Sequence, residues 1–106
     1  MLAYQRTPSQ APHPLTSHAK RISCFSIVAD ADPSVLPRIL DLVAMFNLIP
    51  ERCHVSRSET EPGRPILIDL QIADLDEEDR HRIQKKLERM LLTTQILCSE
   101  KRRAVA

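Results

Sequence analysis

Two aspartates precede a predicted helix start and are the first residues whose chemistry suggests a binding site. Asp30 and Asp32 stand just before a helical pattern that begins near Ser34. Free amides at a helix N-terminus attract anions, and a neighbouring carboxylate can hold an ammonium group. Together these groups would suit the two charged ends of a free amino acid. The competing interpretation is an ordinary capped loop with solvated carboxylates.

Cysteines and histidines offer a second kind of chemistry. These residues are Cys24, Cys53, Cys98, His13, His18, His54 and His81. No pair has CxxC or HxxxH spacing, and the adjacent Cys53 and His54 would point to opposite faces of a strand. We therefore expect no metal site and interpret the cysteines as small buried residues.

Neither nucleophilic catalysis nor phosphate binding is indicated. No nucleophile elbow or glycine-rich oxyanion turn accompanies a Cys/His pair. The chain has one glycine, Gly63, so a phosphate-binding loop is excluded. We expect no catalytic residue and no cofactor, and a protein that is not itself an enzyme.

The composition is that of one small globular domain. The chain has 106 residues, of which 42% are hydrophobic and 27% charged, and its net charge is +1. This balance gives no general attraction to nucleic acid or to an anionic membrane. Three cysteines do not form a secreted disulfide framework, and no apolar run approaches the roughly 18 residues of a membrane span. A cytoplasmic location is expected.

Hydrophobic patterns divide the chain into an arm, a domain and a tail. Residues 1–20 contain three prolines and no apolar period, which is typical of a disordered arm. Residues 21–99 form the predicted domain, and residues 100–106 are interpreted as a flexible basic tail. The predicted elements are strands over 22–29, 48–58, 66–73 and 93–99 and helices over 35–47 and 76–92.

Local signals fix the ends of these elements. Pro37 is tolerated only in the first turn of a helix, which favours Ser34 as N-cap. Pro50 makes the second strand an edge strand. The second helix begins with acidic residues and ends with basic ones, as the helix dipole favours. Its apolar stripe is Ile83, Leu87, Met90 and Leu91.

The β-α-β-β-α-β order predicts a ferredoxin-like α+β sandwich. Right-handed crossovers place both helices on one face of a four-stranded antiparallel sheet. Strands one and three would lie in the centre of that sheet, with strand two at an edge.

A family resemblance agrees with this order. The stretch Asp32-Pro-Ser-Val-Leu-Pro-Arg-Ile-Leu40, followed by Phe46-Asn-Leu-Ile49, resembles the opening of ACT domains, and the likeness spans about 21–99. It is most similar to the short regulatory subunit of acetolactate synthase, an enzyme of branched-chain amino-acid biosynthesis. The matching positions are Asp32, Pro33, Leu36, Arg38, Ile39 and Leu40.

The resemblance implies a homodimer and an effector pocket. In that family two domains often pair through strand two, with effector sites at the seam. The implied dimer edge is Ile49, Glu51, Cys53 and Val55. The implied effector-binding residues are Asp30, Ala31, Asp32, Ser34, Val35 and Leu36.

Two glycines common in the family are replaced. Ser34 follows the proline, and Asn47, which tolerates a left-handed conformation, precedes strand two. The change at Ser34 favours a subunit that activates or stabilises a catalytic large subunit over one that senses valine.

Two alternatives stay open. One is a stand-alone amino-acid-sensing homodimer. The other is a structural or RNA-contacting ferredoxin-like module that uses the basic segments Lys20-Arg21 and Lys101-Arg102-Arg103. Because no aromatic residue flanks these segments, the nucleic-acid signal is weak and no nucleic-acid partner is expected.

Overall fold

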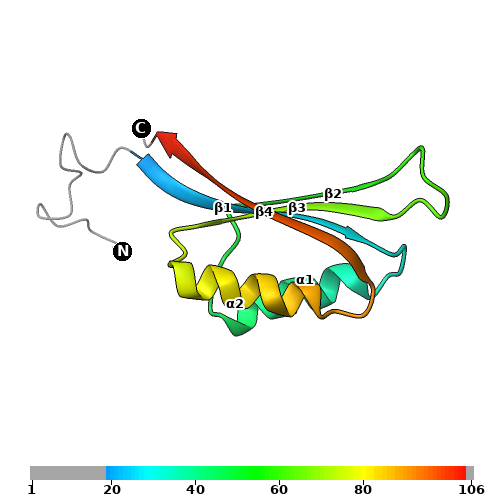
Figure 1. Ribbon diagram of the computed structural model, residues 1–106, viewed down its shortest axis with the longest axis horizontal. Coiled ribbons are helices and arrows are strands. Elements are labelled where there is room, and N and C mark those ends of the chain that lie inside the picture. Colours follow the sequence, from blue (N-terminus) through cyan, green and yellow to red (C-terminus); the bar gives the residue numbers. More distant parts are fainter. Residues whose placement is uncertain (1–18, 105–106) are drawn as a thin grey trace, which may run out of the picture.

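A computed structural model describes residues 19–104, which form a two-layer sandwich. The strands make one antiparallel sheet in the order β2-β3-β1-β4, and both helices lie on the same face of it (Figure 1). The elements are β1 (Ala19–Ala29), α1 (Val35–Met45), β2 (Arg52–Arg57), β3 (Ile66–Ala73), α2 (Glu77–Glu88) and β4 (Thr93–Ala104). The predicted ferredoxin-like fold is confirmed, with β1 and β3 central and β2 at an edge.

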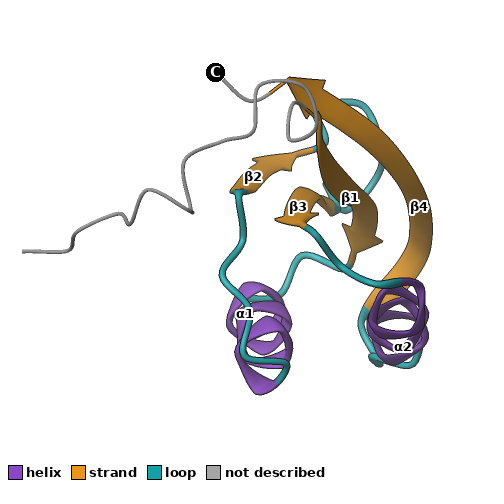
Figure 2. Cartoon of the chain, turned by 90° about the vertical axis from the view of Figure 1, so that its left-hand side faces the viewer, coloured by secondary structure: helices purple, strands orange, loops and turns teal. Residues whose placement is uncertain are grey.

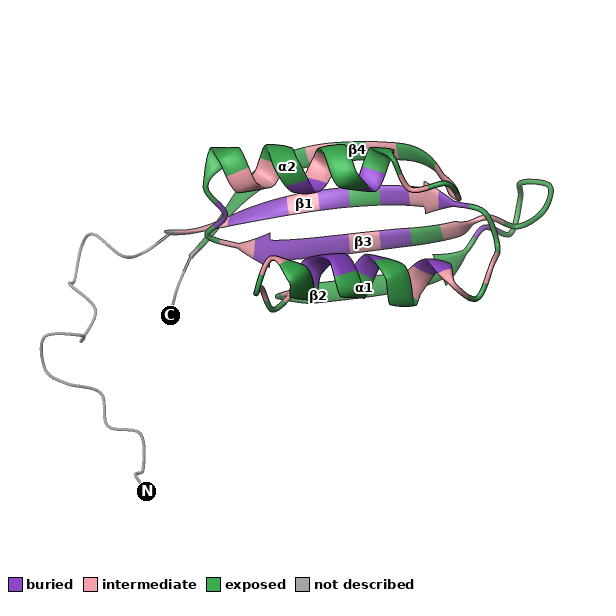
Figure 3. Ribbon diagram, turned by 90° about the horizontal axis from the view of Figure 1, so that it is seen from below, coloured by how far each residue is buried: buried purple, intermediate pink, exposed green. Residues whose placement is uncertain are grey.

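The hydrophobic core lies between the sheet and the helices. Phe25 and Ile27 of β1 pair with Leu70 and Ile68 of β3, and all four are almost completely buried. Directly opposed residues share one face of a sheet, so the period-two pattern of these strands produces the core. The helices α1 and α2 add Val35, Ile39, Leu42, Val43, Ile83 and Leu87. Figure 3 shows these buried segments facing one another.

The two helices cover different halves of the sheet. In Figure 2, α1 lies against β2 and β3, whereas α2 lies against β1 and β4. No helix among the described residues is long and apolar enough to cross a lipid bilayer.

The first helix ends in a Schellman motif that requires a left-handed residue. Asn47 has a φ of 60°, a left-handed conformation that asparagine tolerates. Its amide donates to the Ala44 carbonyl at 2.8 Å, and the Leu48 amide donates to the Val43 carbonyl at 3.3 Å. The helix therefore ends at Met45, before the predicted limit.

This geometry makes Asn47 a test of backbone strain. Asn47→Gly should keep or raise the free energy of unfolding, by up to about 1 kcal/mol, because glycine enters the left-handed region freely. Asn47→Val should lower it by about 1–2 kcal/mol. Urea denaturation measures both changes. Equal stability of the two variants would show that the conformation imposes no strain.

The second helix and the second strand are shorter than predicted. Helix α2 ends at Glu88, and the Thr93 amide then donates to the Met90 carbonyl in the turn that leads to β4. Leu91 is 87% exposed, so its place in the predicted apolar stripe is wrong. Strand β2 begins two residues after Pro50, which has no amide to donate.

The predicted ends of the domain need correction. Strand β4 continues to Ala104, so the prediction of a flexible tail is wrong for residues 100–104. Ala19 and Lys20, assigned to the disordered arm, belong to β1, and residues 1–18 of that arm lie outside the described range. Main-chain pairing between the ends of β1 and β4 extends both strands, and it requires no hydrophobic pattern.

Candidate functional site

The loop between β1 and α1 is ordered by the Asp32 carboxylate. Its Oδ1 accepts a hydrogen bond from the Ser34 amide at 2.8 Å and another from the Ser34 hydroxyl at 2.6 Å. The hydroxyl bond, then the amide bond, holds the pKa of Asp32 below its usual value, and Arg38 adds to this effect. Asp32 is therefore ionised at neutral pH.

These bonds change the predicted role of the helix N-terminus. Ser34 occupies the predicted N-cap position, but its side chain caps no amide and donates to Asp32 instead. The charged carboxylate is the stronger acceptor in this loop. Pro37 also removes one amide from the first turn. The loop consequently presents a carboxylate, where the sequence predicted a set of free amides.

A cation faces this loop from the end of β2. A pocket of about 290 Å³ is lined by Ala31, Asp32, Pro33, Arg57 and Ile66. Arg57 pairs with Ile66 across β2 and β3, and its Nε donates to the Arg64 carbonyl at 2.7 Å, which fixes the guanidinium. The pocket therefore combines a carboxylate, a guanidinium and an apolar wall. Such a set complements a small zwitterion.

The pocket includes two of the six predicted effector residues. Ala31 and Asp32 line it, whereas the other four do not. Asp30 is exposed outside it, Val35 is buried in the core, Leu36 packs against the core, and Ser34 is bonded to Asp32. Sequence reasoning missed Arg57 and Ile66. No local pattern indicated Arg57, because the long connection over residues 58–65 leaves open which residue of the second strand lies opposite residue 66.

The edge strand β2 is exposed along its whole length. Its six residues are all exposed, including Val55 at 41% and Cys53, so the prediction of buried cysteines is wrong for Cys53. Partial burial, and the nearby Asp69 carboxylate, raise the pKa of the Cys53 thiol. Ile49 is 86% exposed just before the strand. The predicted dimer edge is thus open to a second polypeptide.

Glu51 differs from the other residues of this predicted edge. Its Oε1 lies 3.6 Å from Lys20 Nζ and 2.9 Å from Arg103 NH2. The carboxylate therefore binds the far end of the β1–β4 ribbon, and the edge that stays available consists of Ile49, Cys53 and Val55.

The open face of the sheet brings together three residue types of a hydrolytic triad in an unproductive order. His54 and Ser26 both pair with Asp69, so the aspartate lies between them. A triad requires the histidine between the nucleophile and the carboxylate. Within residues 19–104, moreover, no group of three His, Cys, Asp or Glu side chains is arranged to hold a metal ion.

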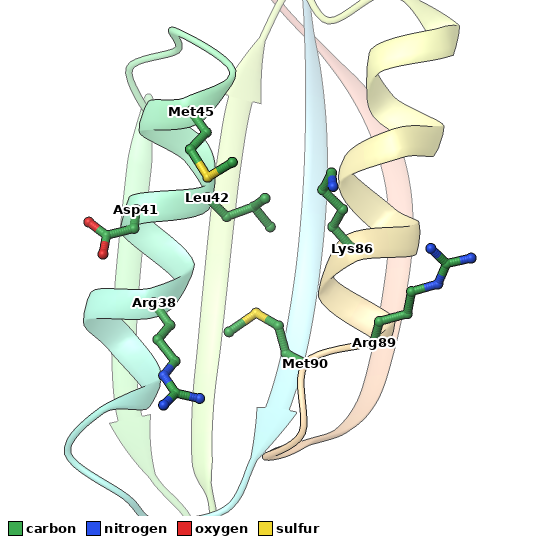
Figure 4. A pocket seen from close by; sticks show the side chains of 7 residues that line it. All are labelled: Arg38, Asp41, Leu42, Met45, Lys86, Arg89 and Met90. Carbon is green, nitrogen blue, oxygen red and sulfur yellow. The ribbon is translucent and has the colours of Figure 1, made fainter.

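A second cavity lies between the helices, where the floor is apolar and the rim cationic. The groove measures about 410 Å³, and its lining residues are Arg38, Asp41, Leu42, Met45, Lys86, Arg89 and Met90. In Figure 4, Leu42 and Met90 lie between the helices, while Asp41 points away from the groove. The groove has three cationic side chains and one carboxylate among its lining residues, whereas the Asp32 pocket has one of each.

Comparison with known proteins places the chain beside a family and a similar solved structure. The family model described as an ACT-like domain matches residues 16–104. Among solved structures, the chain is similar to a putative PII-like signaling protein from Thermus thermophilus, with a TM-score of 0.53 and 16% identity. The match covers 83% of this chain and 91% of that chain, and at this identity it supports the fold alone. No curated protein matches the sequence.

Proposed function

Because the chain belongs to the ACT-like domain family, we propose that it is a non-catalytic regulatory protein that binds a free amino acid as a homodimer. The observation that supports this function best is the pocket between Asp32 and Arg57. Arg57 would receive the carboxylate of the amino acid, and Asp32 would receive its ammonium group. Ile66 and Ala31 leave room for a small apolar side chain.

Pairing through β2 would place this pocket beside the dimer seam. The Ser58 amide donates to the Pro65 carbonyl at 2.9 Å. Because antiparallel strands alternate inward and outward amides, the amides of Cys53, Val55 and Arg57 should point away from β3. They form a free edge that a second copy can pair with. Arg57 then lies at the seam, where a bound effector would contact both copies.

The apolar surface next to this edge supports the same pairing. Val55 points to the helix-covered side of the sheet, since it pairs with Ile68. Leu36 and Leu40 lie one turn apart on the flank of α1 opposite the inter-helix groove, and Leu40 is 39% exposed. A second copy would bury these side chains together with the strand edge.

A regulatory protein of this kind acts on a partner enzyme. We propose that the regulated enzyme is acetolactate synthase, which the similarity of Asp32–Leu40 to its short regulatory subunit supports. Mixing the chain with the thiamine-diphosphate-dependent large subunit should give a complex in size-exclusion chromatography and a change in specific activity. If neither appears, the acetolactate synthase assignment fails, and ligand binding by the isolated dimer would then favour a stand-alone sensor.

Arg57 should decide whether the pocket binds an amino acid. In a thermal-shift screen of the common amino acids, at least one should raise the melting temperature of the wild-type chain. A ligand present at a hundred times its Kd stabilises the native state by about 2.7 kcal/mol. Arg57→Gln should abolish that shift because the carboxylate loses its bidentate partner.

Arg52→Gln is the matched control, since Arg52 begins the same strand and pairs with Gln71 far from the pocket. It should bind the amino acid like the wild type. A screen without any hit, or equal shifts in both variants, would contradict the effector site.

A further inference from the structure

Two rows of like charge cross the far end of the β1–β4 ribbon. Lys20 lies directly opposite Arg103, and Arg21 lies directly opposite Arg102. The two ends of the described chain lie side by side there, in blue and red in Figure 1. Like charges directly opposite one another destabilise a strand pair. The five cations Lys20, Arg21, Lys101, Arg102 and Arg103 are called the basic end below.

The described residues neutralise this basic end only in part. Glu51 contacts Lys20 and Arg103, and Glu100 Oε2 lies 3.2 Å from Arg21 Nε. Two carboxylates therefore serve five cations, which leaves a surplus of three positive charges, although the whole chain has a net charge of only +1.

Two of these cations have no partner of opposite charge within residues 19–104. Lys101 and Arg102 are exposed and take part in none of the ion pairs formed there. They lie on opposite faces of β4, because successive residues of a strand alternate. Each face of β4 therefore carries a positive charge that a ligand can contact.

The same segment is an open strand edge. Strand β4 pairs with β1 alone, so half of its main-chain groups point away from the sheet. Charged residues on an edge strand commonly prevent association between copies. Preventing association requires cations on β4 only. It does not explain why Lys20 and Arg21 of β1 stand directly opposite Arg103 and Arg102. Both strands together repel a second copy and attract a strand of opposite charge.

We propose that the basic end is a docking site for an acidic segment of a partner protein. The segment pairs as an extended strand with the free edge of β4. Its side chains alternate between the two faces, so a run of three acidic residues meets Lys101, Arg102 and Arg103 in turn. The free edge of β4 lies at the opposite edge of the sheet from β2, so a peptide paired there leaves the free edge of β2 and the effector pocket open.

A peptide fits these features better than a nucleic acid. RNA could contact the cations, but it has no strand backbone to pair with the edge of β4. Single-stranded RNA also binds through stacking on aromatic side chains. Within residues 19–104 the aromatic residues are Phe25, which is buried in the core, and Phe46, which follows α1.

Fluorescence anisotropy with a labelled synthetic peptide tests this proposal. The peptide contains the run Asp-Glu-Asp between threonine and valine residues, and the protein is the full chain. Lys101→Glu/Arg102→Glu should weaken binding by about ten-fold or more, because two ion pairs are replaced by repulsion. Lys86→Glu/Arg89→Glu, with the same change in charge at the C-terminal end of α2, should bind like the wild type. Rising salt should weaken the binding.

A second peptide separates strand pairing from charge attraction alone. Methylation of alternate peptide amides keeps every carboxylate but removes donors to the edge of β4, and it should weaken binding further. Equal binding of both peptides, equal binding by the two charge-reversed variants, or no binding to the wild type would each overturn the proposal. Tighter binding of a single-stranded RNA oligonucleotide than of the acidic peptide would assign the basic end to nucleic acid and overturn it as well.

Discussion

Phe25→Ala should lower the free energy of unfolding by about 3–5 kcal/mol. Phe25 is fully buried at the centre of β1, where it pairs with Leu70 on one side and Cys98 on the other. The variant loses the favourable free energy of moving an aromatic ring from water into the core. It also leaves a cavity between the sheet and the helices. Because domains of this size are stable by only about 5–15 kcal/mol, this loss is a large part of the total. Urea denaturation followed by circular dichroism measures the change.

Two further substitutions keep this prediction informative if Phe25→Ala does not fold. Ser26→Ala changes the next residue of the same strand, which is exposed on the other face, and it should alter stability by less than about 0.5 kcal/mol. Phe25→Leu should cost less than the alanine variant, since most of the volume is retained. Similar costs at positions 25 and 26 would mean that the core does not lie between the sheet and the helices.

Val55→Pro should convert the proposed homodimer into monomers. Position 55 is central in β2, and its amide is inferred to point away from β3. Proline removes that donor and places a ring at the edge, while the inward amides of the strand are kept. Two hydrogen bonds are lost per symmetric dimer, each with a net contribution of about 1 kcal/mol, so the dissociation constant should rise at least about thirty-fold. Analytical ultracentrifugation over a concentration series measures it.

Val55→Thr is the control for this experiment, because it keeps the amide, the branching at Cβ and nearly the same volume. It should dimerise with an affinity close to that of the wild type. A wild-type chain that stays monomeric at high concentration would contradict the dimer itself. Equal dimerisation of Val55→Pro and Val55→Thr would instead place the interface somewhere other than β2.

The effector pocket and the dimer can be tested separately. Arg57→Gln acts on the amino acid alone, whereas Val55→Pro acts on association. If the effector contacts both copies at the seam, Val55→Pro should also weaken the thermal shift caused by the amino acid. Retention of the full shift in the monomeric variant would show that Asp32 and Arg57 of one copy bind the effector without the other.

The fold and its core could be predicted from local patterns of residues. Alternation in residues 66–73 and helical spacing from Val35 onward are local patterns, and each depends only on the period of one element. Pro37 and Pro50 likewise act on their own backbone, which is why the start of α1 and the edge position of β2 were predicted correctly. The family resemblance depends on residues 32–40 and 46–49, which include Pro37 and Asn47.

Contacts between side chains far apart in the sequence could not be predicted, because they depend on how the strands pair. Arg57 reaches the Asp32 pocket because β2 and β3 pair with residue 57 opposite residue 66, and no local pattern announces this register. The two basic segments, which lie at the predicted boundary of the disordered arm and in the predicted flexible tail, meet as like-charged rows through main-chain pairing of β1 with β4. Main-chain hydrogen bonds do not depend on side-chain type, so such a ribbon forms without the hydrophobic alternation by which strands are recognised.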